Sequence, residues 1–321
     1  MKYPLVSIII PVYNSEDFIK DALLSAINQT YKNIEIIVID DGSTDSTSEI
    51  VQKIIKDNPA RKIIYYRNDK NRGVSYSRNL GIKISKGKYI AFLDGDDMYD
   101  HTKIEKQINK CLSEESGICY CGYYNLINGK AIKEKIKFIS GYILYNYLKK
   151  ETWPHLNCFL FEKKIVENTT LFNEDRMWGE DVELVVKIIS KYKVVCVNEY
   201  LYYYRKGHSS ATSSKLDVLS QIEGDYNLWV DVEKWLNRNM NIYIYDVDRV
   251  NKIINDFLLP RLIIDKMFYL YRKRDFENTI IAFKKYGHIV SSMKLTNLSC
   301  VKLFIKYYLL SRFYNEKAKN Y

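Results

Sequence analysis

Tyr89-Ile-Ala-Phe-Leu-Asp-Gly-Asp-Asp97 joins an apolar run of five residues to three carboxylates. The apolar run predicts a buried strand that presents Asp94, Asp96 and Asp97 at its carboxyl end. Carboxylates this close repel one another and raise one another's pKa unless a cation lies between them. A hard divalent cation takes oxygen ligands and often shares them with a substrate phosphate. The stretch therefore indicates a metal site, with a solvated acidic turn as the alternative.

The sequence before this strand alternates between two hydrophobic periods. β-branched runs at residues 6–12, 34–39 and 62–66 predict strands, and apolar spacing at residues 16–28, 50–55 and 74–85 predicts helices. Strand–helix alternation predicts βαβ units and a parallel sheet with right-handed crossovers. Ligands on such sheets bind beyond the carboxyl ends of the strands. Asp40 and Asp41 also follow a predicted strand, so we expect both acidic clusters at one edge of the sheet.

Length and composition limit which classes of protein this chain can belong to. A chain of 321 residues with 47% hydrophobic residues is long and apolar enough to fold around a sizeable core. No stretch reaches the ~20 apolar residues that span a bilayer, and the N-terminus does not resemble a signal peptide, so we expect a cytoplasmic protein. The cysteines contain no C-x-x-C pair, and we expect reduced, buried thiols.

The positive charge is concentrated in the C-terminal third. From Arg261 onward, thirteen Lys and Arg face four Asp and Glu, which accounts for +9 of the net +10. Residues 300–314 place apolar and aromatic side chains at helical spacing between lysines, which is typical of a helix lying on an anionic membrane. The alternative is packing against the rest of the chain or a second subunit. No nucleic-acid-binding motif accompanies the charge. Pro260 predicts the end of one helix and the start of another.

The chain resembles the family 2 glycosyltransferases, which have the GT-A nucleotide-sugar fold. Each matching segment is weak alone, but six occur in register over about two-thirds of the chain. The resemblance implies an α/β, Rossmann-like nucleotide-sugar-binding domain at residues 1–215, followed by a mostly helical, basic region at 216–321. The six segments are Ser7–Asn14, Ile39–Asp45, Asn71–Gly81, Phe92–Asp97, Trp178–Asp181 and Tyr202–Thr212.

The resemblance implies a nucleotide site that includes Pro11, Tyr13, Asp41 and Arg78. Asp41 matches the acid that accepts a hydrogen bond from uracil, a role that suits a carboxylate because it only accepts when ionised. The alternative is that Asp40 and Asp41 open a turn and cap a helix. Arg78 would grip a phosphate or base edge, with a surface ion pair as its alternative.

The resemblance also assigns the acidic strand end. Asp94 and Asp96 match the D-x-D pair that contacts the ribose and a Mn²⁺ or Mg²⁺ bridging the diphosphate, and Asp97 is a further metal ligand. Such an ion stabilises the charge that gathers on a departing diphosphate. The segment from Arg205 matches a loop that folds over the nucleotide, with Arg205 on the diphosphate and His208 on the metal. For His208 an ordinary loop histidine is the alternative.

Glu180 and Asp181 precede a predicted helix. Two acids in a first turn are favoured by the helix dipole alone. In the family, an Asp of such a pair is the general base, so the resemblance implies that Asp181 deprotonates the acceptor hydroxyl while Glu180 holds the acceptor or a neighbouring backbone amide. One displacement with one base inverts the anomeric configuration, whereas retention by double displacement needs a nucleophilic carboxylate.

The sequence thus predicts an inverting, metal-dependent transferase that moves a hexose or N-acetylhexosamine from a UDP-sugar. The acceptor would be a glycan of a surface polysaccharide on a lipid carrier, or of a glycoprotein, with the enzyme cytoplasmic or peripheral on the membrane. Trp153, His155 and Trp178 are candidates to stack on a sugar ring, with core packing as the alternative. One rival is a non-catalytic subunit that keeps the fold and binds a glycan or partner. A nucleotidylyltransferase would need a glycine-rich phosphate loop, which residues 11–14 do not supply.

Overall fold

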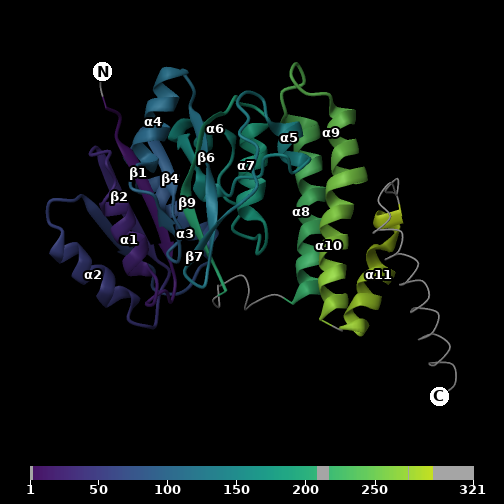
Figure 1. Cartoon of the computed structure of the whole chain (residues 1–321), viewed down its shortest axis with the longest axis horizontal. Helices are drawn as coiled ribbons and strands as arrows, with labels where there is room; N and C mark the ends of the chain where they lie inside the picture. The colour runs from purple at the N-terminus through teal and green to yellow at the C-terminus, as the bar shows by residue number, and fades with distance from the viewer. Residues whose placement is uncertain (1–2, 208–216, 274, 292–321) are drawn as a thin grey trace. The chain divides into compact units, whose positions relative to one another are not determined.

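Four parallel strands carry the first half of the fold. The computed structural model describes residues 3–207, 217–273 and 275–291. The strands lie side by side in the order β3-β2-β1-β4, of which Figure 1 labels β2, β1 and β4, and their parallel pairing confirms the predicted parallel sheet in this part of the chain. Every residue of three of them is buried, as expected for strands covered on both faces. The bounds are Val6–Val12 (β1), Ile34–Asp40 (β2), Ile63–Arg67 (β3) and Tyr89–Phe92 (β4).

The sheet continues beyond β4 with mixed strand directions. β8 is antiparallel to both of its neighbours, β4 and β6, and β9 is parallel to β6. The carboxyl ends of β1, β2, β4, β6 and β9 therefore lie at one edge of the sheet. The remaining strands are Met98–Tyr99 (β5), Ile118–Ile127 (β6), Lys130–Lys133 (β7), Phe159–Glu162 (β8) and Val195–Lys206 (β9), in the order β4-β8-β6-β9-β5 with β7 beside β6.

Helices cover both faces of this sheet. Side chains of α1, α2 and α4 share one apolar cluster with alternate residues of β1, such as Ile8 and Ile10. Gly81 of α3 lies against Ile9, whose side chain points to the opposite face, and a β-carbon at Gly81 would come within 2.3 Å of it. The helices are α1 (Ile19–Ile27), α2 (Thr47–Asp57), α3 (Val74–Ile84), α4 (Lys103–Ser113), α5 (Leu144–Leu148), α6 (Lys163–Thr169) and α7 (Glu180–Ile189).

The described residues after 216 are helical, as predicted. Contacts divide the chain into two compact units, Met1–Ser210 with Trp235–Tyr245 and Ala211–Lys234 with Asp246–Tyr321. The predicted boundary between residues 215 and 216 lies outside the described residues. The helices are α8 (Val218–Asn239), α9 (Val247–Ile253), the π-helix η2 (Ile254–Leu258), α10 (Leu259–Arg272) and α11 (Phe276–Ser291).

Pro260 does not break the helix that contains it. It is the second residue of α10, directly after the π-helical turn η2. The residues flanking this junction keep right-handed helical dihedrals. A proline lacks the N–H that would bond one turn back, and a widened turn accommodates that loss while the helix continues. The predicted start of a new helix at Pro260 is therefore confirmed to within one residue, because α10 begins at Leu259, but the chain stays helical through the junction.

The described residues test the predictions about membrane helices and about the cysteines only in part. Within the described ranges, no helix combines the length and the apolar character needed to cross a membrane. The predicted amphipathic helix at residues 300–314 lies outside those ranges. The five cysteines before residue 292 are buried free thiols, as predicted.

Candidate active site

Asp41 lies just past the end of β2 and holds a neighbouring loop. Its backbone N–H donates to Val12 O of β1 at 2.8 Å, which aligns the two strand ends. Its Oδ1 accepts from Asn68 Nδ2 at 2.7 Å and from the Arg72 N–H at 2.9 Å, and its Oδ2 accepts from the Gly73 N–H at 2.8 Å. A carboxylate accepts about four hydrogen bonds. Three are used by the described part of the chain, so Oδ2 can accept one more.

Asp40 performs the structural role that was the alternative for this acidic pair. Its Oδ1 accepts from the Ser43 N–H at 2.8 Å, which closes the turn after β2, and its Oδ2 accepts from Tyr65 Oη at 2.7 Å. Pro11 is buried near the end of β1, and Tyr13 is half-buried directly beyond it. Both acids are buried, but their roles differ: Asp40 closes the turn after β2, and Asp41 holds the loop of residues 68–73 at the sheet edge.

Arg78 is a buried bridge between two acidic segments. Only 6% of its side chain is exposed, and its two terminal nitrogens donate to Asp94 Oδ1 at 2.9 Å and Glu180 Oε1 at 2.8 Å. Burial opposes the charge of the guanidinium, but the surrounding carboxylates outweigh it and raise the pKa of Arg78. Arg78 is therefore not the exposed ion pair that was its alternative. Its side chain joins the end of β4 to the start of α7, and the two acids that it contacts, Asp94 and Glu180, are 86 residues apart in the sequence.

Asn157 holds the other oxygen of Asp94. Its Nδ2 donates to Asp94 Oδ2 at 2.8 Å and to Tyr202 Oη at 2.9 Å. Tyr202 Oη in turn donates to Asp97 Oδ2, and Asp97 Oδ1 accepts from the Arg205 N–H at 2.7 Å. Asp97 is buried, and burial with the charges of the neighbouring acids raises its pKa well above the usual range. The carboxylate of Asp97 thus joins the acidic turn to β9.

Asn157 was not among the predicted residues. It lies in the 3-10 turn η1 (Leu156–Cys158) before β8, and its surrounding sequence carries no motif that marks a site. Tyr202 belongs to a segment that matched the family, but the match gave it no role. Both contacts depend on tertiary structure, because β8 pairs with β4 and β9 pairs with β5, which directly follows the acidic turn.

Arg205 packs onto the backbone of the acidic turn. Its Nε donates to Asp96 O at 2.9 Å, one terminal nitrogen lies 3.3 Å from Asp21 Oδ2, and the guanidinium carbon is 4.9 Å from the centre of the Phe18 ring. The structure thus places this predicted diphosphate contact at the D-x-D turn. His208, the predicted metal ligand that follows, lies outside the described residues.

The described part of the chain offers few carboxylates that could bind a metal ion. Asp96 is half-buried and 31% of the Asp94 side chain is exposed, whereas Asp97 is buried. In the described ranges, no group of three or more His, Cys, Asp or Glu side chains is arranged to hold an ion. Mg²⁺ in phosphate-transfer sites characteristically binds one or two carboxylates together with substrate phosphates. Asp96, with Asp94 beside it, fits a metal of that kind.

Glu180 and Asp181 open α7 next to this network. Gly179 precedes them with φ 76°, in the left-handed region that favours glycine, so the chain turns sharply into the helix. Burial raises the pKa of both acids. The charge of Arg78 and backbone N–H groups partly offset this for Asp181, while the charge of Asp94 adds to it. A carboxylate with a raised pKa is a better proton acceptor near neutral pH.

The three candidates for sugar stacking have different surroundings. Trp153 stacks on Tyr147, with ring centres 4.3 Å apart. His155 lies between Tyr123 and Tyr204, with centres 4.5 and 4.7 Å away, and burial together with the charge of Lys206 lowers its pKa to about 4. His155 is therefore neutral at physiological pH.

Trp178 is half-buried immediately before Gly179, so of the three candidates it is the nearest in sequence to the acidic pair.

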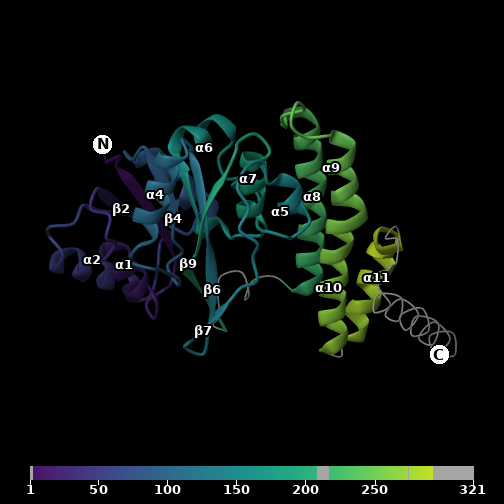
Figure 2. The ribbon, with the colours of Figure 1, turned by 45° about the horizontal axis from the view of Figure 1, so that its top comes forward.

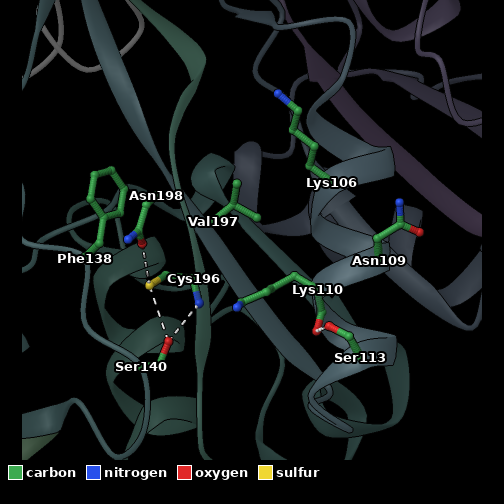
Figure 3. Close-up of a pocket in the computed structure, with 9 residues that line it drawn as sticks. All are labelled: Lys106, Asn109, Lys110, Ser113, Phe138, Ser140, Cys196, Val197 and Asn198. Atoms are coloured by element: carbon green, nitrogen blue, oxygen red, sulfur yellow. Dashed lines mark hydrogen bonds between the residues drawn. The ribbon is translucent and has the colours of Figure 1, made fainter.

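A separate shallow groove contains none of the predicted site residues. It lies between α4 and β9 (Figure 3), and its two lysines on α4 are engaged in ion pairs with nearby glutamates. The residues that line it are Lys106, Asn109, Lys110, Ser113, Phe138, Ser140, Cys196, Val197 and Asn198.

Solved structures share this fold at low sequence identity. The S. aureus TarS fragment 1-349 in complex with UDP-GlcNAc superposes with a TM-score of 0.65 at 19% identity, covering 89% of this chain and 81% of that one. The mannosyltransferase PcManGT from Pyrobaculum calidifontis, in complex with GDP-Man and Mn²⁺, gives 0.61 at 14% identity, covering 97% and 81%. Both are GT-A glycosyltransferases, which confirms the predicted fold class.

Sequence comparison identifies the family. The model for Glycosyl transferase family 2 matches residues 7–172. An uncharacterized glycosyltransferase of Rickettsia typhi is 36% identical over 75% of this chain and 75% of its own length. The UDP-Glc:alpha-D-GlcNAc-diphosphoundecaprenol beta-1,3-glucosyltransferase WfaP of Escherichia coli is 37% identical over 67% of this chain and 82% of its own length. The chain therefore belongs to glycosyl transferase family 2.

Proposed function

We propose that this transferase moves a hexose or N-acetylhexosamine from a UDP-sugar to a lipid-linked glycan acceptor during surface polysaccharide synthesis, with inversion and with a divalent metal ion. The observation that carries this proposal is the Arg78 bridge. It joins Asp94 on the donor side to Glu180, the neighbour of the proposed base Asp181. Donor-binding and proton-accepting carboxylates then belong to one connected site.

Asp41 supports the choice of a uracil base. Its Oδ2 can accept one further hydrogen bond, and an imide N–H would donate it. WfaP carries UDP-Glc in its name and TarS was solved with UDP-GlcNAc, whereas PcManGT was solved with GDP-Man. Guanine also presents N–H donors, so a GDP-sugar is the competing donor. Pro11 and Tyr13 at the end of β1 would line the same base site.

The proposed metal ion is Mn²⁺ or Mg²⁺, held by Asp96 together with the donor diphosphate. When bound, such an ion neutralises charge on the departing diphosphate. Asp94 is fixed by Arg78 and Asn157 and would face the ribose. Arg205 holds the backbone of Asp96 in place and, with His208, remains a proposed contact to the diphosphate side.

Asp181 is the proposed general base. Its raised pKa suits it to take the proton of the acceptor hydroxyl while that oxygen attacks the anomeric carbon opposite the diphosphate. The C1–O bond to the diphosphate breaks as the new bond forms, and a single displacement inverts the configuration. Glu180 is engaged by Arg78, so its role is to position the start of α7.

Transfer assays test the proposal directly. Purified full chain is incubated with UDP- and GDP-sugars, a lipid-diphosphate monosaccharide acceptor and Mn²⁺, with and without chelator. We expect metal-dependent transfer from a UDP-sugar and a loss of at least ~10²–10⁴ in kcat for Asp181→Asn, with UDP affinity retained. Glu174→Gln, an exposed acid on the preceding loop, is the matched control. Transfer or hydrolysis unchanged by Asp181→Asn would reject this base, and no turnover of any donor would favour a non-catalytic binding subunit.

A further inference from the structure

The hairpin of β6 and β7, together with the end of β9, extends the sheet beyond the other strands (Figure 2). Its end, with the end of β9, is called the ribbon tip here and comprises residues 125–133 and 204–206. Register places three side chains in one row across it, because Ile127 pairs with Lys130 of β7 and with Lys206 of β9. Paired residues point to the same face of a sheet. An apolar side chain is thus flanked by a cation on each side.

The next row on the same face continues this pattern. Asn125 pairs with Ile132 of β7 and with Tyr204 of β9. Ile132 is 53% exposed and Ile127 is 38% exposed, so two branched apolar side chains face solvent, the first on the edge strand β7 and the second on β6, which is paired on both sides. Natural edge strands usually present charge and not isoleucine at such positions. The exposed isoleucines of the ribbon tip therefore indicate a surface that binds a partner.

The charge near the two isoleucines is positive. Residues 128–137 contain one acid, Glu134, and four exposed lysines, of which Lys130 shares the face of the isoleucines, Lys133 points to the opposite face and Lys137 is 3.6 Å from Glu151. Glu134 already accepts from Asn125 Nδ2 at 2.6 Å. Lys206 adds a further exposed cation from β9. The partner of this surface must offer both negative charge and an apolar layer.

The face of the ribbon tip is continuous with the candidate active site. Tyr202, whose hydroxyl contacts Asn157 and Asp97, lies four residues before Lys206 on the same strand and the same face. At about 3.3 Å per residue, Lys206 lies roughly 13 Å beyond Tyr202. The charge of Lys206 also lowers the pKa of His155, which is further evidence that the two ends of this face are close.

We propose that the ribbon tip is a contact surface for an anionic membrane. The isoleucines enter the boundary between headgroups and acyl chains while the lysines contact lipid phosphates, as in interfacial elements that combine apolar area with basic charge. The consequence for catalysis rests on the proposed function: a membrane at the ribbon tip would bring a lipid-linked acceptor to the edge of the sheet where Asp94 and Asp181 lie.

Vesicle flotation with the full-length chain tests the proposal independently of catalysis. The probes are vesicles of equal parts phosphatidylglycerol and phosphatidylcholine, and vesicles of phosphatidylcholine alone. Each lysine near an anionic surface contributes roughly a fivefold factor in partitioning, so Lys130→Gln with Lys206→Gln should weaken binding to the anionic vesicles about thirtyfold. Ile127→Ser with Ile132→Ser should weaken it as well. The charge-matched control is Lys53→Gln with Lys56→Gln on the exposed side of α2.

The outcomes separate this surface from its rivals. The proposal is overturned if both ribbon variants bind anionic vesicles as well as the unmodified chain does. It is also overturned if the α2 control loses vesicle binding to the same extent, or if vesicle binding is lost only when Lys302 and Lys306 are replaced. A further contrary result is that the ribbon variants still bind vesicles but transfer less sugar to the lipid-diphosphate acceptor in detergent. The ribbon tip would then bind the acceptor itself and not the membrane. Hydrolysis of the nucleotide sugar should be unchanged in the ribbon variants. Vesicle binding lost in an otherwise inactive protein would support the membrane surface and reject only the proposed function.

Discussion

Asn157 Nδ2 donates to Asp94 Oδ2 at 2.8 Å, and this bond fixes the first carboxylate of the D-x-D turn. The other oxygen of Asp94 accepts from Arg78 at 2.9 Å. With both oxygens anchored, Asp94 has one orientation before any ligand binds. Such support by neighbouring groups is what holds a binding constellation in its productive geometry. Asn157 is therefore a positioning residue in the proposed mechanism.

Replacing Asn157 by Ala should separate donor binding from chemistry. Asp94 Oδ2 and Tyr202 Oη lose their common donor, so we expect a higher KM for the nucleotide sugar with a smaller change in kcat. The free energy of unfolding should fall by about 1–3 kcal/mol, the cost of a buried polar group left without its partner. Steady-state kinetics and urea denaturation measure the two effects. Asn109→Ala, on the exposed side of α4, is the control, and an unchanged KM would contradict the positioning role.

Arg78→Met should destabilise the protein in a pH-dependent way. Removing the cation leaves Asp94 and Glu180 without their shared partner, and losing one member of a buried ion pair costs about 3–5 kcal/mol. Burial already raises the pKa of Glu180, and without the charge of Arg78, which lowers it, that pKa rises further, so the folded state holds the proton of Glu180 more tightly. The loss is small below the unfolded pKa of about 4 and grows as the pH rises through the folded pKa.

Urea denaturation of Arg78→Met at pH 4 and at pH 7.5 checks this expectation. Arg72→Met is the matched control because its guanidinium is exposed and lies 3.7 Å from the centre of the Tyr76 ring. An equal loss at both pH values would show that packing, and not charge, explains the effect.

Asp96→Asn should remove the metal dependence of nucleotide binding. Among the three acids of the turn, Asp97 is buried and bonded to Tyr202 and Arg205, and Asp94 is anchored on both oxygens. Asp96 is half-buried and matches the second acid of the D-x-D pair, so we expect it to share an ion with the diphosphate. Calorimetric titration of UDP with and without Mn²⁺ measures the difference. Asp57→Asn at the end of α2 is the control, and tight UDP binding that ignores chelator would disprove the assignment.

The pH profile of transfer should have an acidic limb set by Asp181. The base must be ionised to accept a proton, and burial raises its pKa, so kcat/KM should fall as the pH drops through a value above the usual range of an aspartate. His155 cannot supply this limb, because its pKa of about 4 leaves it neutral throughout. The fall of kcat/KM at acidic pH should therefore persist in the His155→Phe variant. It should be absent from the residual activity of the Asp181→Asn variant. A limb that moves with His155→Phe would point to the histidine instead.

Local pattern was sufficient to predict the first half of the fold. The apolar runs that become β1, β2 and β4 are buried on both faces, so nearly every residue is hydrophobic and each run is visible in sequence. The same periodicity predicted that Asp41 and Asp94 to Asp97 follow strand ends at one edge. Parallel strands force those ends together whatever the details of packing.

Tertiary structure alone decided how the acids are used. Whether Asp97 faces a ligand or the core depends on β9, more than 100 residues away, bringing Tyr202 and Arg205 to it. Arg78 is a bridge and not a surface residue because α7 begins beside it, and Asn157 reaches Asp94 only once antiparallel β8 pairs with β4. Contacts of this range leave no periodic signal in the sequence, since each depends on one side chain meeting one partner after the sheet has formed.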